Sequence, residues 1–154
     1  MNHVIVRRAI QSAKTRIHLA IDIWTSPNNH LFLAICASFT DHTDQFRNIL
    51  IGLRTVPGQS GEHQWSVLLP VMEEYGSIKM IGTIVGDNSG TNDTLCRKIA
   101  EYLAEEYRID WNVSQNRIRC QGHILNLVVQ AYLFSTEEEE EEIASYDKDE
   151  LSNE

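Results

Sequence analysis

The sequence predicts a mixed α/β domain whose elements follow the order β-β-β-α-β-α-(β)-α. Three observations lead to this fold class. Apolar runs separated by short polar turns occupy residues 17–54, a helical pattern begins near residue 61, and a fourth apolar run at 80–85 precedes a second helical pattern. A meander of strands followed by alternating helices and strands is typical of a sheet covered by helices.

The first three elements are predicted to be strands over residues 17–24, 31–40 and 45–54. Isoleucine and leucine recur at alternate positions in the first of them, which is the period of a strand. Turn-forming residues at 27–29 and 41–44 separate the three runs. Because these connections are short, we expect an antiparallel meander.

A helix is predicted next, with Ser60 or Gly61 near its start and Gly76 just past its end. Its apolar residues recur at helical spacing on one face. The apolar run at 80–85 then predicts a fourth strand. Because a helix connects the meander to this strand, we expect it to return parallel to the first strand.

Three further elements complete the pattern. A second helix is predicted over 91–107, with Asp93 in its first turn, where an acid meets the positive end of the helix dipole. A short strand or turn follows at 117–120. The last helix, 122–134, is apolar on most faces, and we therefore expect it to be buried.

Two aspartates stand out against this arrangement. Asp22 lies inside the first strand, and Asp87 ends the fourth. A carboxylate inside a strand costs several kcal/mol to bury unless something compensates it. We expect the two strands to be neighbours, so the two acids would converge, and a shared divalent cation would compensate their charge.

The length and the charge distribution of the chain indicate its domain organisation. The chain has 154 residues, enough for one domain with a core, and its net charge is −9. Residues 137–154 carry all of that net charge, whereas residues 1–136 are neutral. We expect a helical or flexible leader at 1–14, a partial domain at 15–134 and a disordered acidic tail at 135–154.

The sequence shows neither a run of about 20 apolar residues nor a secretion signal, and its three cysteines are too scattered for a disulfide framework. We therefore expect no membrane partner and a reducing compartment. Two basic clusters remain open to two interpretations, either solvated surface charge or contact with nucleic acid. They comprise Arg7, Arg8, Lys14 and Arg16 in the first cluster, and Arg117 and Arg119 in the second.

Three segments together resemble one known family. They are Ile-Asp-Ile-Trp-Thr-Ser at 21–26, Val-Gly-Asp-Asn-Ser-Gly-Thr-Asn-Asp at 85–93, and the Cys-x-x-His segment at 119–130. In this order and at these separations, they resemble motifs of the hAT superfamily of DNA transposases. The resemblance covers roughly residues 15–134.

The resemblance implies a ribonuclease H-like fold and a site of three acids that binds two Mg²⁺ or Mn²⁺ ions for phosphodiester cleavage and strand transfer. Asp22 matches the first acid and Asp87 the second. The third acid of the family is a glutamate beyond a helical insertion domain, and no position here matches it. The chain is therefore expected to be a truncated core, inactive alone and binding metal weakly.

The resemblance also implies that Cys120 and His123 help to position DNA next to the active site. It implies transposon-end DNA as the partner, nuclear localisation, and homo-oligomers formed through regions that this chain does not contain. Two other interpretations of this pair stay open, a buried cysteine with a hydrogen-bonded histidine, and zinc. A structural zinc site needs about four ligands, and no second pair is present at matching spacing.

Other residues also have alternative interpretations. Asp87 suits a turn or the start of a helix as well as a metal site. Trp24 is more often a core residue than a platform for stacking bases. For the whole chain, the alternatives are a non-catalytic interaction protein derived from a transposase, and a different ribonuclease H-like nuclease that completes its site from within these residues.

Overall fold

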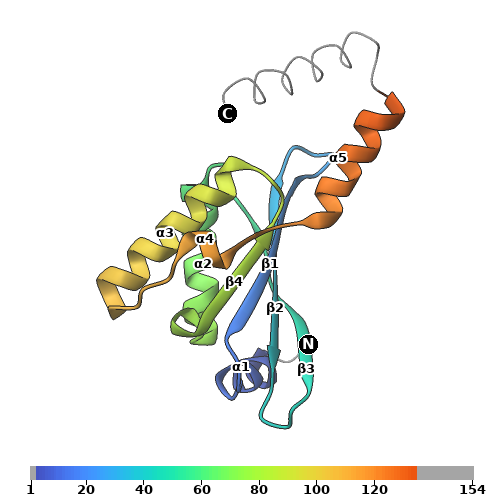
Figure 1. Ribbon diagram of the computed structural model, residues 1–154. Coiled ribbons are helices and arrows are strands. Elements are labelled where there is room, and N and C mark those ends of the chain that lie inside the picture. Colours follow the sequence, from blue (N-terminus) through green and yellow to red (C-terminus); the bar gives the residue numbers. More distant parts are fainter. Residues whose placement is uncertain (1–2, 135–154) are drawn as a thin grey trace, which may run out of the picture. The chain divides into compact units, whose positions relative to one another are not determined.

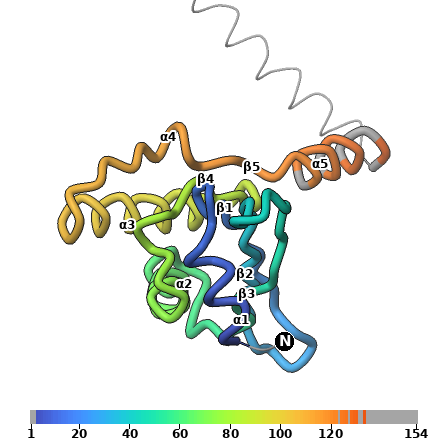
Figure 2. Tube along the Cα trace, turned by 90° about the horizontal axis from the view of Figure 1, so that it is seen from below, coloured from blue at the N-terminus to red at the C-terminus, as the bar shows by residue number. Residues whose placement is uncertain are grey.

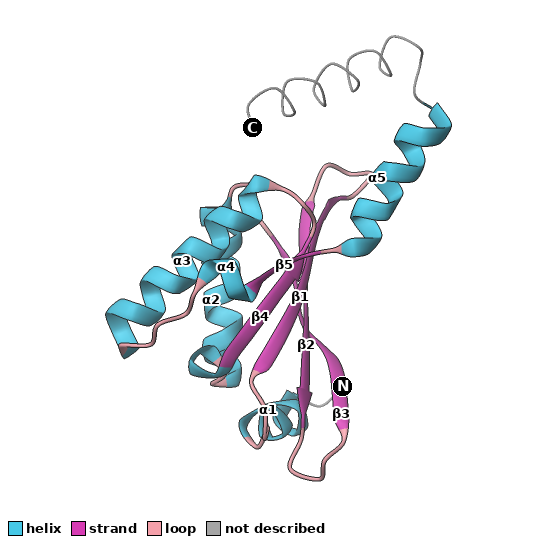
Figure 3. Ribbon diagram, in the orientation of Figure 1, coloured by secondary structure: helices cyan, strands magenta, loops and turns pink. Residues whose placement is uncertain are grey.

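The computed structural model describes residues 3–134, except for five side chains in the last helix. The predicted acidic tail at 135–154 lies outside the described residues. The chain divides into two units, residues 1–120 and 121–154. Figure 1 shows the sheet and the helices of the first unit, and Figure 3 shows the same view coloured by secondary structure.

The predicted elements occur in the predicted order. The strands are β1 (Ile17–Thr25), β2 (Leu31–Thr40), β3 (Phe46–Thr55), β4 (Ile81–Gly86) and β5 (Arg117–Arg119). The helices of the first unit are α1 (His3–Gln11), α2 (Gly61–Tyr75), α3 (Gly90–Tyr107) and α4 (Val113–Asn116), with a 3₁₀ turn, η1 (Ile78–Met80). Of these, α1, α4 and η1 are present in addition to the predicted elements. The second unit contains α5 (Gln121–Phe134).

The sheet has the order β3-β2-β1-β4-β5, which makes β1 the central strand. β1 pairs antiparallel with β2, and β2 pairs antiparallel with β3, as the short connections predict. β4 returns parallel to β1, and β5 is parallel to β4. The expected adjacency of the strands that carry Asp22 and Asp87 is therefore confirmed.

The core lies on one face of this sheet. Ile17, Leu19 and Ile21 of β1 are buried, whereas the residues between them are exposed. α1, α2 and α3 contribute apolar side chains to the same core, and Figure 2 shows α2 and α3 on one side of the strands. Each fully buried isoleucine or leucine contributes about 1.5–3 kcal/mol. Burial on this face therefore fixes which residues of β1 point away from the helices.

The opposite face carries exposed apolar side chains on several strands. Trp24 is 41% exposed and stacks on Phe32 with ring centroids 5.8 Å apart, while Leu50, Leu53 and Ile118 are also exposed. The prediction that Trp24 is a core residue is therefore wrong. Trp24 follows Ile23 by one position, and one position along a strand changes the face.

The ends of α2 follow the predicted signals. Ser60 is the N-cap, and its hydroxyl accepts a hydrogen bond from the backbone N–H of His63. Gly76 ends the helix in the left-handed conformation, with φ = 65°, which glycine adopts without a steric penalty. These caps fix the length of the helix that crosses from β3 to β4.

The turn between β2 and β3 contains a buried acid that was not singled out in the sequence. Asp41 is 3% exposed and accepts hydrogen bonds from the hydroxyl and N–H of Thr43, from the N–H of Gln45 and from Arg47. The Thr43 hydroxyl, followed by the Arg47 guanidinium and the backbone donors, holds the pKa of this carboxyl well below its ordinary value. Asp41 is therefore satisfied by protein donors alone.

α5 differs from the expectation. Its described apolar side chains are exposed, with Leu125 at 64%, Val128 at 59% and Leu133 at 61%. The prediction of a buried helix is thus not met for these side chains. Among the described residues, no helix is both long enough and apolar enough to cross a membrane.

Candidate functional site

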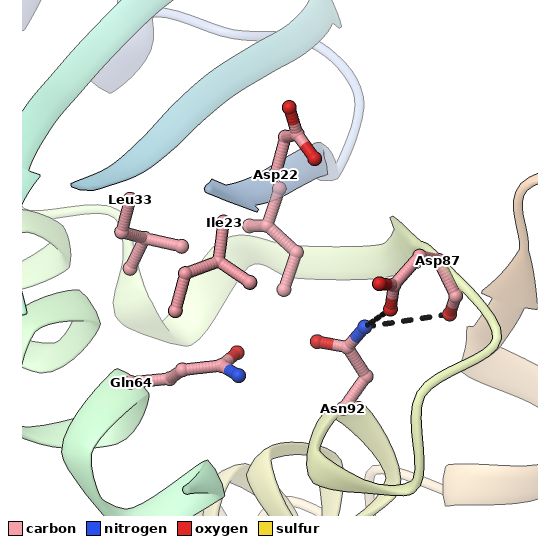
Figure 4. Close-up of a pocket in the computed structure, with 7 residues that line it drawn as sticks. Asp22, Ile23, Leu33, Gln64, Asp87 and Asn92 are labelled. Carbon is pink, nitrogen blue, oxygen red and sulfur yellow. Dashed lines mark hydrogen bonds between the residues drawn. The ribbon is translucent and has the colours of Figure 1, made fainter. Parts of the chain in front are cut away.

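Asp22 and Asp87 lie at one small pocket of the first unit. Asp22 is on β1, and Asp87 directly follows β4, the parallel neighbour of β1. Both residues line the pocket, together with Gln64 of α2 and Asn92 of α3 (Figure 4). The remaining lining residues are Ile21, Ile23 and Leu33. The topology therefore brings the two predicted acids into one neighbourhood.

The surroundings of Asp22 differ from the expectation of a buried carboxylate. Asp22 is exposed, because it alternates with the buried residues of β1. Figure 4 shows its carboxylate directed away from Gln64 and Asn92. Within residues 3–134, this carboxylate makes neither a hydrogen bond nor an ion pair with another side chain. Asp22 consequently carries no burial penalty, and the expected need for compensation does not apply to it.

Asp87 is held by its own turn and by the first turn of α3. Its Oδ1 atom accepts a hydrogen bond from the N–H of Ser89 at 3.0 Å and from the side-chain amide of Asn92 at 2.5 Å. The bond to Ser89 closes a turn of the kind that aspartate favours. Ser89 is itself the N-cap of α3, so the carboxylate is fixed relative to the start of the helix.

Two buried amides lie beside Asp87 and were not recognised as site residues in the sequence. Asn92 is 3% exposed and Gln64 is fully buried. The Gln64 amide N–H group donates to the carbonyl of Gln59 and to the hydroxyl of Thr91, whereas its Oε1 atom has no partner in the part of the chain that the structure describes. The only signal in the sequence was a polar residue on the apolar side of a predicted helix, which is weak evidence alone.

The starts of α2 and α3 are in close contact at Gly61. A Cβ at this position would lie 2.6 Å from the backbone N of Leu95 and 2.6 Å from the carbonyl oxygen of Thr91. Only glycine permits this approach. The contact sets the position of Thr91, which accepts the Gln64 hydrogen bond and precedes Asn92. The pocket is thus shaped by backbone packing as well as by side chains.

Arg117 of β5 holds the main chain at Asp87. Its side chain is 6% exposed, and its guanidinium donates to the carbonyl oxygens of Gly86 and Asp87. It also lies 3.4 Å from the carboxylate of Asp93. The interpretation of Arg117 as solvated charge is therefore wrong, because its guanidinium is buried against the turn, whereas the contact of this basic cluster with nucleic acid stays a prediction. Arg119, two positions on, is exposed.

The Cys-x-x-His pair falls on the boundary of the two units. Cys120 is half-buried, and its N–H donates to the carbonyl of Gly86 at 2.8 Å, which continues the pairing of β5 with β4. The side chain of His123 lies outside the described residues. The predicted role of Cys120 and His123 in positioning DNA thus stays a prediction.

The donors at the pocket suit a hard cation but form only part of its shell. Carboxylate oxygens match the preference of Mg²⁺ and Mn²⁺. Where the chain is described, no group of three or more histidine, cysteine, aspartate or glutamate side chains is placed to hold a metal. Asp22 and Asp87 would therefore supply two of the ligands, and further oxygen donors would have to come from water or from elsewhere.

Comparison with known proteins agrees with this fold. The family model of the ZBED1 RNase-like domain matches residues 20–115. A protein named as a transcriptional regulator, tpeD of Talaromyces stipitatus, is 31% identical over 124 residues, which are 80% of this chain. The chain spans only 14% of the length of that protein. No solved structure matches. From the match over residues 20–115 and the five-stranded sheet, the chain belongs to the family of the ZBED1 RNase-like domain.

Proposed function

We propose that this chain is the first part of the catalytic core of an hAT-type DNA transposase, or of a nuclear protein derived from one. In this proposal, Asp22 and Asp87 are two of the acids that bind Mg²⁺ or Mn²⁺, and the DNA of transposon ends is the substrate. The observation that supports it most is that Asp22 on β1 and Asp87, directly after the parallel neighbour β4, line the same pocket.

The residues of the pocket would have different roles in such a site. When bound, the metal ions supply charge stabilisation for the phosphodiester group and activate the attacking water or 3′-hydroxyl. Asp87 offers a carboxylate that is already oriented, and Asp22 offers one that is free to turn. Cys120 and His123 would orient the DNA.

The chain alone is proposed not to cleave DNA. Asp22 and Asp87 are two of the three acids of the family, and positioning and charge stabilisation are the main sources of the rate in phosphoryl transfer. A missing ligand should therefore reduce the rate by orders of magnitude.

A second candidate function is a non-catalytic interaction protein that kept the fold. Two observations favour it. The exposed carboxylate of Asp22 has no hydrogen-bond or ion-pair partner among the described residues, and the relative from Talaromyces stipitatus is named as a transcriptional regulator. In this case, the two aspartates are remnants and bind no metal.

Manganese binding separates the two candidates. Titration of the chain with Mn²⁺, followed by the electron paramagnetic resonance signal of the free ion, should show weak binding that Asp22→Ala and Asp87→Ala each reduce. Asp110→Ala is the matched control, because Asp110 is exposed and lies outside the pocket. Equal binding by the wild type and by the double variant Asp22→Asn/Asp87→Asn would instead favour the interaction protein.

A nicking assay on supercoiled DNA tests the proposal that the chain alone does not cleave DNA. The wild-type chain should leave the plasmid intact in the presence of Mg²⁺ or Mn²⁺. A metal-dependent nickase activity that is lost in Asp22→Ala would show that the chain completes its own site, and the proposed dependence on a missing acid would be wrong.

A further inference from the structure

The hydrogen bonds to Asp87 are distributed unequally between its two carboxylate oxygens. The N–H of Ser89 and the amide of Asn92 both donate to Oδ1. Among the described residues, no donor reaches Oδ2. The carboxylate therefore has one occupied oxygen and one available oxygen, even before any ligand binds.

The amide of Asn92 has little freedom to leave this position. Asn92 is 3% exposed, lies in the first turn of α3, and also donates from Nδ2 to the main-chain carbonyl of Asp87 at 3.3 Å. A Cβ at Gly86 would lie only 3.0 Å from this same nitrogen, so the strand end packs closely on the amide. Its nitrogen faces the carboxylate because an amide oxygen there would be repelled.

We propose that Asn92 is a positioning residue that makes Asp87 a one-oxygen ligand and so favours Mg²⁺ and Mn²⁺ over Ca²⁺. This inference rests on the proposed metal-binding function of Asp87. Ca²⁺ takes six to eight oxygen ligands and readily accepts both oxygens of one carboxylate, whereas Mg²⁺ requires a compact octahedral shell. Mn²⁺ shares the preference for six oxygen ligands. A carboxylate with one occupied oxygen therefore suits Mg²⁺ and Mn²⁺ better than Ca²⁺.

The test compares the dissociation constants of the chain for Mn²⁺ and Ca²⁺ in variants of Asn92. Mn²⁺ is titrated directly by its paramagnetic resonance signal, and Ca²⁺ by competition against Mn²⁺. In Asn92→Ala, Mn²⁺ affinity should fall about tenfold, as is usual when the hydrogen-bond partner of a ligand is lost. Ca²⁺ affinity should fall less, because Oδ1 of Asp87 then keeps only the hydrogen bond from Ser89 and gains a free lone pair for a second contact with the ion.

A second variant keeps the test independent of packing defects. Asn92→Asp preserves the shape of the side chain but replaces the donor with an acceptor, so the ratio of Mn²⁺ to Ca²⁺ affinity should again shift severalfold toward Ca²⁺. Asn88→Ala is the matched control, because Asn88 is an exposed asparagine of the same turn. Its ratio should equal that of the wild type. Chemical denaturation without metal confirms that each variant is folded.

The outcomes separate this inference from the proposed function. If Mn²⁺ binding depends on Asp87 but the ratio is unchanged in both Asn92 variants, the role of Asn92 is wrong and the metal site stands. If the wild-type chain shows no binding that depends on Asp87, both the metal site and the role of Asn92 are overturned.

Discussion

The two aspartates of the pocket come from neighbouring strands of the sheet, yet their surroundings are opposite. Asp87 accepts two hydrogen bonds on its carboxylate and two from Arg117 and Asn92 on its main-chain carbonyl. Asp22 is exposed and has no such partner among residues 3–134. One acid is fixed by its neighbours, and the other is fixed only by its backbone.

This difference follows from the two faces of the sheet. Asp87 lies at a strand end, where the first turn of α3 and the buried side chain of β5 can reach it. Asp22 points to the face on which Trp24 and Leu53 are also exposed. The described chain thus preorganises one half of the candidate site, and the orientation of the other half depends on a ligand or on further protein.

The largest effect on the free energy of unfolding is expected at Gly61, where the starts of α2 and α3 are in close contact. Gly61→Ala would place a methyl group 2.6 Å from backbone atoms of Leu95 and Thr91, which cannot yield as a side chain can. We expect a loss of about 2–3 kcal/mol in the free energy of unfolding, although helix propensity alone favours alanine by about 1 kcal/mol. Urea denaturation measures the loss. A more stable variant would show that the two helix starts are not in close contact.

The next largest effect on the free energy of unfolding is expected when the carboxylate of Asp87 is removed. Asp87→Ala leaves the buried amide of Asn92 and the N–H of Ser89 without their acceptor, and we expect a loss of about 2 kcal/mol. Thermal and urea unfolding in the absence of metal give this value. If Asp87→Ala were as stable as the wild type, the network around Asp87 would not be formed in solution, and the contrast with Asp22 would disappear.

A third aspartate, Asp41, tests whether hydrogen-bond donors around a carboxylate stabilise the folded protein. The pKa of Asp41 lies well below its ordinary value of 3.8, so its stabilising effect is complete above about pH 4 and is lost as the pH falls further. The unfolding free energy of the wild type should therefore decrease in acid more steeply than that of Asp41→Asn. Urea denaturation from pH 6 to pH 2.5 compares the two slopes. Parallel slopes would mean that the four donors do not stabilise the ionised form.

The smallest effect on the free energy of unfolding is expected at Asp22. Asp22→Asn should change the free energy of unfolding by no more than about 0.5 kcal/mol, as is usual for an exposed residue without partners. A stabilisation well above this value would indicate that Asp22 is repelled by other negative charge near the open face. A loss comparable to that of Asp87→Ala would show that Asp22 has a partner in solution.

Much of the fold could be predicted because its signals are local. The period of two in β1, the short turns of the meander, and the caps Ser60 and Gly76 each depend on a few neighbouring residues. The parallel return of β4 follows from a general preference in how helices connect strands. The position of Asp87 next to β1 followed from these elements without knowledge of any contact.

The errors concern side chains whose surroundings come from distant parts of the chain. For Arg117 the sequence left solvated charge and nucleic-acid contact open, and neither interpretation anticipated that the turn after β4 offers its guanidinium two carbonyl oxygens. Asn92 falls within the helix predicted over 91–107, but its bond to Asp87 depends on how α3 starts after the turn that follows β4. The error at Trp24 is an exception with a local cause, because its alternation with Ile23 already implied its exposure.

By itself, the sequence determined the elements, their order and the adjacency of the two strands that carry Asp22 and Asp87, because hydrophobic period, turns and caps act over short distances. Only the tertiary structure decided that the carboxylate of Asp87 is bound on one oxygen and that Asp22 faces the open side of the sheet. A hydrogen bond needs two atoms within about 3 Å in the correct orientation. That condition is set by packing between segments far apart in the chain.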